Sequence, residues 1–123
     1  MARNAGQAAQ PISPQQELND AYSDLLDDLN EAYWAAGSLN TKDQIKGFID
    51  AVTDVVTALD AADLSSRDAA YNELNTQVKG INNQLQTLQK QINGIISRIN
   101  TAASIVSNIS TVVSVAGRVF PAV

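Results

Sequence analysis

Residues 71–120 read YNELNTQVKGINNQLQTLQKQINGIISRINTAASIVSNISTVVSVAGRVF, and their pattern indicates how the chain folds. An apolar or small residue returns at alternating steps of four and three positions throughout this stretch. The average step of about 3.5 residues keeps one seam of a helix facing a partner helix. The seam consists of Tyr71, Leu74, Val78, Ile81, Leu85, Leu88, Ile92, Ile95, Ile99, Ala102, Val106, Ile109, Val113, Ala116 and Phe120. The stretch therefore predicts a long helix that packs against other helices.

The rest of the composition also favours an all-α protein. The chain has 123 residues, which is enough for one domain with a modest core. No proline occurs between Pro14 and Pro121, so no helix in this range is interrupted by proline. Residues 1–13 lack an apolar segment, and we expect them to form a flexible N-terminal tail. Residues 14–123 should form a single helical domain.

We expect three helices, at residues 14–36, 42–62 and 66–120. Ser13 can cap the first helix while Pro14 occupies its first position, and Gly37 can end it. Thr41 and Gln44 have the spacing of a capping box at the start of the second helix. These signals predict a helical hairpin that packs on one long amphipathic helix.

The helix lengths allow two architectures. At 1.5 Å per residue the long helix would extend roughly 75–80 Å, about twice the length of the hairpin. If it is continuous, its distal half needs a partner outside the hairpin. If it breaks near Asn93-Gly94, the chain forms a four-helix bundle. We favour the continuous helix because the heptad phase passes through Gly94 unchanged. A strand near residues 111–120 is a minor alternative, because that segment is rich in β-branched residues.

Missing residue types argue against enzymatic chemistry. The chain contains neither cysteine nor histidine, which removes thiolate nucleophiles, imidazole bases and the usual transition-metal ligands. Its acidic residues have the spacing of a solvated helix surface and match no known metal-binding loop. We therefore expect no catalytic, cofactor or metal site and no small-molecule substrate.

Charge is divided unevenly along the chain, whose net charge is −5. Residues 1–73 contain all thirteen acids and four cations, and residues 74–123 contain only four cations. Four cations over fifty positions do not make a phosphate-binding patch, so we expect no nucleic-acid partner. The acids of the first helix could instead face a basic protein, and the candidate face consists of Asp24, Asp27, Asp28 and Glu31.

The segment 99–117 carries no charge, since Arg98 and Arg118 enclose nineteen uncharged residues. This length is close to that of a membrane-spanning helix, although eight of these residues are polar. No signal peptide or clear transmembrane helix is apparent, so the chain is expected to be cytoplasmic or exported by a leaderless route. Several such helices could shield their hydroxyl and amide groups within a membrane assembly.

Trp34-Ala35-Ala36-Gly37 lies where the first two predicted helices meet. This turn resembles the Trp-x-Gly turn of the WXG100 family of small secreted helical hairpins, with one extra residue before the glycine. The resemblance covers this turn and not the long third helix. We interpret Trp34 as a buried anchor at the end of the hairpin.

The preferred function is structural and non-enzymatic. The chain would form homo-oligomers, or bind another helical protein, through a coiled-coil-like seam. The alternatives are a membrane-active or pore-forming protein that uses residues 99–117, and a small acidic inhibitor or immunity-type protein. The central seam consists of Leu85, Leu88, Ile92, Ile95, Ile99, Val106, Ile109, Val113 and Phe120.

Overall fold

The computed structural model describes residues 13–61 and 69–120, and all regular structure in these two ranges is helical. The predicted all-α fold is therefore confirmed. The predicted tail falls outside the described residues, apart from Ser13. The helices are α2 (Pro14–Ala35), α3 (Leu39–Ala61), α4 (Ala69–Lys90), the single turn α5 (Ile92–Ile95) and α6 (Ile99–Val119).

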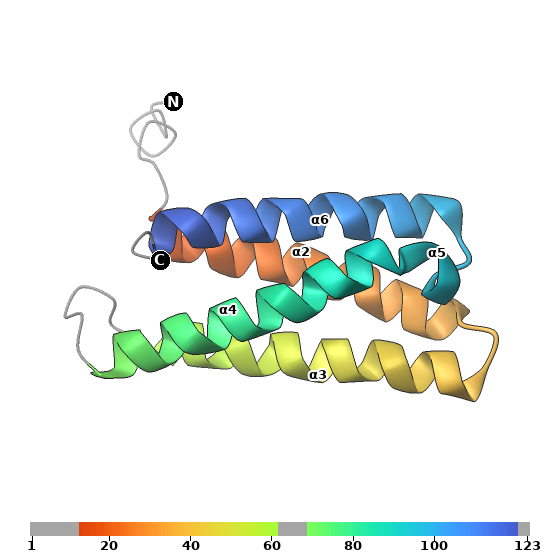
Figure 1. Ribbon diagram of the computed structural model, residues 1–123, viewed down its shortest axis with the longest axis horizontal. Helices are drawn as coiled ribbons and strands as arrows, with labels where there is room; N and C mark the ends of the chain where they lie inside the picture. Colours follow the sequence, from red (N-terminus) through yellow and green to blue (C-terminus); the bar gives the residue numbers. More distant parts are fainter. Residues whose placement is uncertain (1–12, 62–68, 121–123) are drawn as a thin grey trace, which may run out of the picture.

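The four long helices run alternately up and down in an antiparallel bundle (Figure 1). Helix α2 packs extensively against both α6 and α3, and α4 closes the bundle through smaller contacts with α3 and α6. Helix α6 lies antiparallel to α2, so the last of the described helices covers the first of them. The connection between α2 and α3 and the turn α5 lie at the same end of the bundle (Figure 1).

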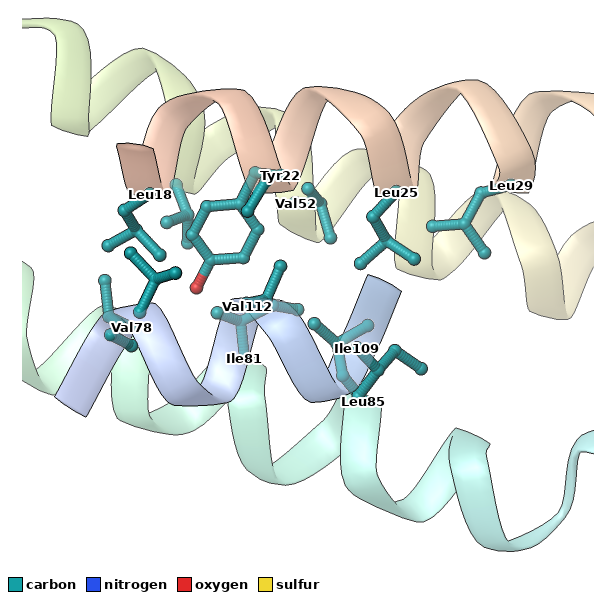
Figure 2. Close-up of a cluster of buried hydrophobic side chains, with 14 of the residues drawn as sticks. Leu18, Tyr22, Leu25, Leu29, Val52, Val78, Ile81, Leu85, Ile109 and Val112 are labelled. Atoms are coloured by element: carbon teal, nitrogen blue, oxygen red, sulfur yellow. The ribbon is translucent and has the colours of Figure 1, made fainter. Parts of the chain in front are cut away.

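The core is filled by one apolar stripe from each long helix. Figure 2 shows these side chains pointing toward one another from all four helices, with the Tyr22 ring among them. Such a stripe places an apolar side chain at every turn of each helix, and its burial is the main stabilising contribution to a bundle of this size. The fully buried aliphatic members include Leu18, Leu25, Leu29, Ile45, Val52, Leu59, Leu85, Ile105, Ile109 and Val112.

The hairpin forms largely as predicted, with one correction. The Ser13 side chain accepts a hydrogen bond from the Gln16 amide at 3.1 Å, and Pro14 is the first helical residue. Helix α3, however, begins at Leu39, three residues before the expected start. The side chain that caps it is Ser38, whose Oγ accepts a hydrogen bond from the Thr41 amide at 3.1 Å. The capping box predicted at Thr41 and Gln44 is therefore wrong, because Thr41 already lies inside the helix.

The continuous helix predicted at residues 66–120 is also wrong within its described part. Helix α4 ends at Lys90, and the chain passes through α5 and an extended segment before α6 starts at Ile99. The backbone is extended at Ile96 (ψ 113°) and Arg98 (ψ 118°), and these residues complete the reversal. The alternative four-helix bundle, broken near Asn93-Gly94, is the observed fold. Helix α6 continues to Val119, so the strand alternative at residues 111–120 is wrong as well.

Burial explains why the helix breaks. A straight helix would leave the apolar face of α6 without a partner inside the chain, whereas reversal places Ile105, Ile109 and Val112 in the core. The connection uses residues 91–98, which is ample for an antiparallel helix pair. Gly94 does not adopt a left-handed conformation, so the reversal does not depend on a glycine-specific backbone geometry.

A buried polar pair joins α2 to α4 through the core. The Tyr22 hydroxyl of α2 donates a hydrogen bond to Asn82 Oδ1 of α4 at 2.9 Å, and both residues are buried. Burying a polar group costs free energy unless the group has a hydrogen-bond partner, so this bond offsets the cost of burying both residues. The pair joins two helices that are not neighbours in the sequence and thereby favours one register between them.

Replacing Tyr22 by phenylalanine should lower the free energy of unfolding by about 1–3 kcal/mol, because the Asn82 carbonyl would then be buried without its donor. Urea denaturation followed by circular dichroism measures this change. Tyr33→Phe removes the same group from a half-buried position and should have a smaller effect. Adding Asn82→Leu to Tyr22→Phe should restore much of the loss, and no recovery would contradict the importance of the pair.

Tyr22 also predicts sensitivity to alkali. Burial raises the pKa of its hydroxyl well above the ordinary value. The folded chain then retains a proton that the unfolded chain loses above about pH 10, so stability should fall by about 1.4 kcal/mol per pH unit from that point. Denaturation at pH 9 to about 11 tests this expectation. Tyr22→Phe should show a shallower decline, and equal slopes for both proteins would contradict it.

Candidate functional site

The predicted oligomer seam lies mostly inside the bundle. Leu85, Leu88, Ile92, Ile109 and Phe120 are buried in the core of the single chain. Ile95, Val106 and Val113 are partly buried and pack against that core, and only Ile99 is exposed. Within the described residues, the partner of the distal seam is therefore mainly helix α2 of the same chain.

Helix α6 differs from the other helices in the character of its outer face. Its exposed residues are almost all small and uncharged, and Arg118 is the one charged residue between Ile99 and Val119. A helix at the surface of a soluble protein normally carries charges on its outer face. The exposed positions are Asn100, Ala103, Ser104, Ser107, Ser110, Thr111, Ser114, Gly117 and Arg118, in addition to Ile99.

Among the described residues, α6 is also the one helix that is long and apolar enough to cross a membrane by length and composition. Of its most apolar window, 39% is buried inside the bundle. A core helix of a soluble protein can meet the same composition test when most of it is buried. The remaining residues of the window are partly or fully exposed, so α6 combines the composition of a membrane helix with one face toward solvent.

Carboxylates of α2 hold the polar side chains of α6. Asp28 accepts hydrogen bonds from Ser104 and from Asn108, the latter at 2.6 Å. One turn further along α2, Glu31 accepts a hydrogen bond from the Thr101 hydroxyl at 3.2 Å. These contacts give three polar groups of α6 a charged acceptor inside the chain.

The same interface is closed at its other end by an ion pair. Arg118 donates to Glu17 at 2.8 Å, and both side chains remain partly exposed. An exposed pair of this kind contributes at most about 1 kcal/mol to stability. Its main consequence is positional, because it fixes the end of α6 against the start of α2.

The predicted basic-partner face is thus only partly available. Asp24 and Asp27 are exposed on α2, whereas Asp28 is half-buried and bonded to α6. Glu31 is exposed but is also engaged by Thr101. The structure therefore divides the four predicted residues into two that face solvent and two that contact α6.

A second unusual feature is the end of the bundle that contains the α2–α3 connection and α5, which we call the loop end and define as residues 29–45 and 84–105. Three large apolar side chains are exposed in the described residues, and all three belong to this end. Trp34 is 76% exposed, Leu39 is 74% exposed and Ile99 is 83% exposed. The interpretation of Trp34 as a buried anchor is therefore wrong, because the helix turns its indole toward solvent.

Trp34 belongs to a small cluster of aromatic and cationic groups. Its ring meets that of Tyr33 edge to face, with centroids 5.2 Å apart. Lys42 Nζ lies 4.6 Å from the Tyr33 centroid and 5.3 Å from that of Trp34, and it donates a hydrogen bond to the Tyr33 carbonyl at 2.9 Å. Cation–π attraction orients the ring of Trp34 without burying it.

The loop end is also hollowed. A cavity of about 260 Å³ separates the α2–α3 connection from α5 and the extended segment before α6. Most of the residues that line it are small, including Ala35, Gly37 and Gly94, and Arg98 lines it as well. Its lining includes hydroxyl groups such as those of Ser38 and Ser97 but no carboxylate that could act as their base. Among the described residues, no group of three or more acidic side chains is arranged to hold a metal ion.

The sequence contained a signal for this end, but the heptad pattern concealed it. Ile99 was assigned to the seam because its spacing is correct, although it follows the extended segment and is no longer in phase with α4. Leu39 falls between the predicted helices at residues 14–36 and 42–62, so the prediction gives it no helical position. Once a break near Gly94 is assumed, all three side chains fall at the ends of helices that meet.

Comparisons with known proteins add no functional information. No protein-family model matches the chain, and neither a curated protein nor a solved structure matches it.

The Asp28 contacts predict how firmly α6 is held. Replacing Asp28 by alanine should make amide exchange in α6 about tenfold faster, because Ser104 and Asn108 lose their shared acceptor. Hydrogen–deuterium exchange measured helix by helix tests this effect. Asp27→Ala makes the same change in charge at an exposed position and is the matched control. Equal exchange in the two variants would contradict a specific role for Asp28.

Proposed function

We propose that the protein is a non-enzymatic, membrane-active helical bundle in which α6 is the segment that enters the lipid. The observation that carries this proposal is the position of α6. A helix without internal charge before Arg118 turns one face toward solvent, and three of its polar side chains donate hydrogen bonds to carboxylates of α2.

The dimensions of α6 suit a bilayer. Its 21 residues extend about 32 Å, close to the roughly 30 Å of a hydrocarbon core. Arg98 and Arg118 flank the uncharged segment, and long cationic side chains can reach the headgroup region from either side of a membrane.

The hydroxyl-rich face of α6 bears on what happens after insertion. A single helix with so many serine and threonine residues is poorly matched to lipid, but small polar residues allow close helix–helix packing and hydrogen bonds between helices. Entry of several copies would therefore be favoured over entry of one. In this scheme the self-association expected from the seam takes place in the membrane, where Ile109 and Val113 have left the core of the bundle.

Adding charge to the outer face of α6 tests the proposal. Ser107→Asp with Ser114→Asp should leave the bundle intact, because both residues are exposed. Each charge near the middle of a spanning helix costs about 2.5–3.5 kcal/mol, so dye release from vesicles should fall at least about tenfold. Wild-type protein should release dye from the same vesicles.

The matched control places the same charges elsewhere. Thr53→Asp with Thr57→Asp adds two acids to exposed positions on α3 and gives the same net charge. This variant should retain most of the dye release. If wild-type protein releases no dye, or if the two double variants lose activity equally, α6 is not the membrane segment. Light scattering of the variants in solution shows whether a soluble oligomer, as the seam predicted, changes in parallel.

A further inference from the structure

We infer that the loop end is the surface by which the folded bundle first binds a membrane, and that its partner is a bilayer containing anionic lipid. This inference rests on the proposed function, since it names the surface and the lipid class that bring α6 to the membrane.

The apolar contribution comes from Trp34, Leu39 and Ile99. They occupy the penultimate position of α2 and the first positions of α3 and α6, so three different helices present one large apolar side chain each at the same end. Exposed apolar side chains scattered over a surface need no explanation, but gathering of all three at one end does. Tryptophan in particular favours the interface between water and lipid, where its ring can be apolar on one side and wet on the other.

The net charge of the loop end favours a bilayer that contains anionic lipid. At the loop end Lys42, Lys90 and Arg98 outnumber Glu31 and Asp43, which gives a net charge of +1. The remaining described residues contain nine acids and three cations, a net charge of −6. An anionic surface therefore attracts one end of the bundle and repels the rest. This distribution favours end-on binding, and a zwitterionic surface would lack this electrostatic contribution to affinity and orientation.

End-on binding places the start of α6 against the lipid. Ile99 is the first residue of α6 and the most exposed of the three apolar side chains. Arg98 precedes it, and the neighbouring hollow is bounded by Glu31, Arg98 and Asn100. The helix that we propose to insert therefore begins at the surface that we propose to dock.

Trp34 provides the measurement because it is the only tryptophan in the chain. The probe is vesicles of phosphatidylcholine mixed with phosphatidylglycerol, and vesicles of phosphatidylcholine alone serve as the comparison. On the mixed vesicles we expect Trp34 fluorescence to shift to shorter wavelength and to be quenched by brominated lipid. Affinity for phosphatidylcholine alone should be lower by about tenfold.

Matched variants separate the two contributions. Leu39→Ser with Ile99→Ser should weaken binding to the mixed vesicles about tenfold while the fold is retained, because both side chains are exposed. Arg98→Glu should weaken binding by about tenfold, since it removes one attractive charge and adds a repulsive one. Lys79→Glu makes the same change at an exposed position outside the loop end and should have a smaller effect.

A second reporter distinguishes docking from insertion. The chain lacks cysteine, so Ser107→Cys can be labelled with an environment-sensitive dye at a single exposed position on α6. A lipid-dependent signal from both reporters supports both proposals, and a Trp34 response without a dye response supports docking and contradicts insertion. A dye response while Trp34 remains in water overturns the loop-end surface and leaves the proposed function standing. Equal binding to both types of vesicle, or equal losses for Arg98→Glu and Lys79→Glu, also overturns the inference.

Discussion

The fold depends on one requirement, which is that the apolar faces of α4 and α6 must be buried by a single chain. The α2–α3 hairpin is about as long as either helix alone, so it can cover both only if they lie side by side. Reversal at residues 91–98 satisfies this requirement and brings α6 antiparallel to α2 (Figure 1). The free energy lost by ending a helix is small compared with the free energy gained by burying residues such as Ile105 and Ile109.

Within that bundle, the polar contacts are arranged in two layers with different roles. The Tyr22–Asn82 hydrogen bond lies in the core and couples α2 to α4, where a wrong register would leave both groups unpaired. The bonds from Asp28 and Glu31 lie nearer the surface and couple α2 to α6. Water can replace a surface partner more readily than a core partner. The side-chain hydrogen bonds between α2 and α6 are therefore easier to exchange with water than the Tyr22–Asn82 bond, whereas the apolar core contacts of α6 are not.

The sequence was sufficient for the helical class, for the cap at Ser13 and for the apolar residues of each helix. It was insufficient for the connection of α4 to α6, because the heptad phase is a property of each helix and does not report whether two helices are one. The spacing of Leu88, Ile92, Ile95 and Ile99 is regular through the point where the backbone becomes extended. The same ambiguity concealed the loop end, since Ile99 has seam spacing but an exposed side chain. Whether a helix breaks at such a point depends on two free energies, that of keeping the helix continuous and that of burying its apolar face. The second depends on which other helices the whole chain provides.

Helix α6 combines properties that serve two environments. Its inner face is as apolar as a core requires, and its outer face is small and polar enough for water without carrying the charges that would exclude it from lipid. A helix needed only for the bundle could carry lysine or glutamate at Ser107 or Ser114, since both positions are exposed. A helix that lived only in lipid would have no need of the carboxylates that bind Ser104 and Asn108. The proposal of membrane activity accounts for both features, because the acids of α2 accept hydrogen bonds in water from three side chains that neighbouring helices would satisfy in the membrane.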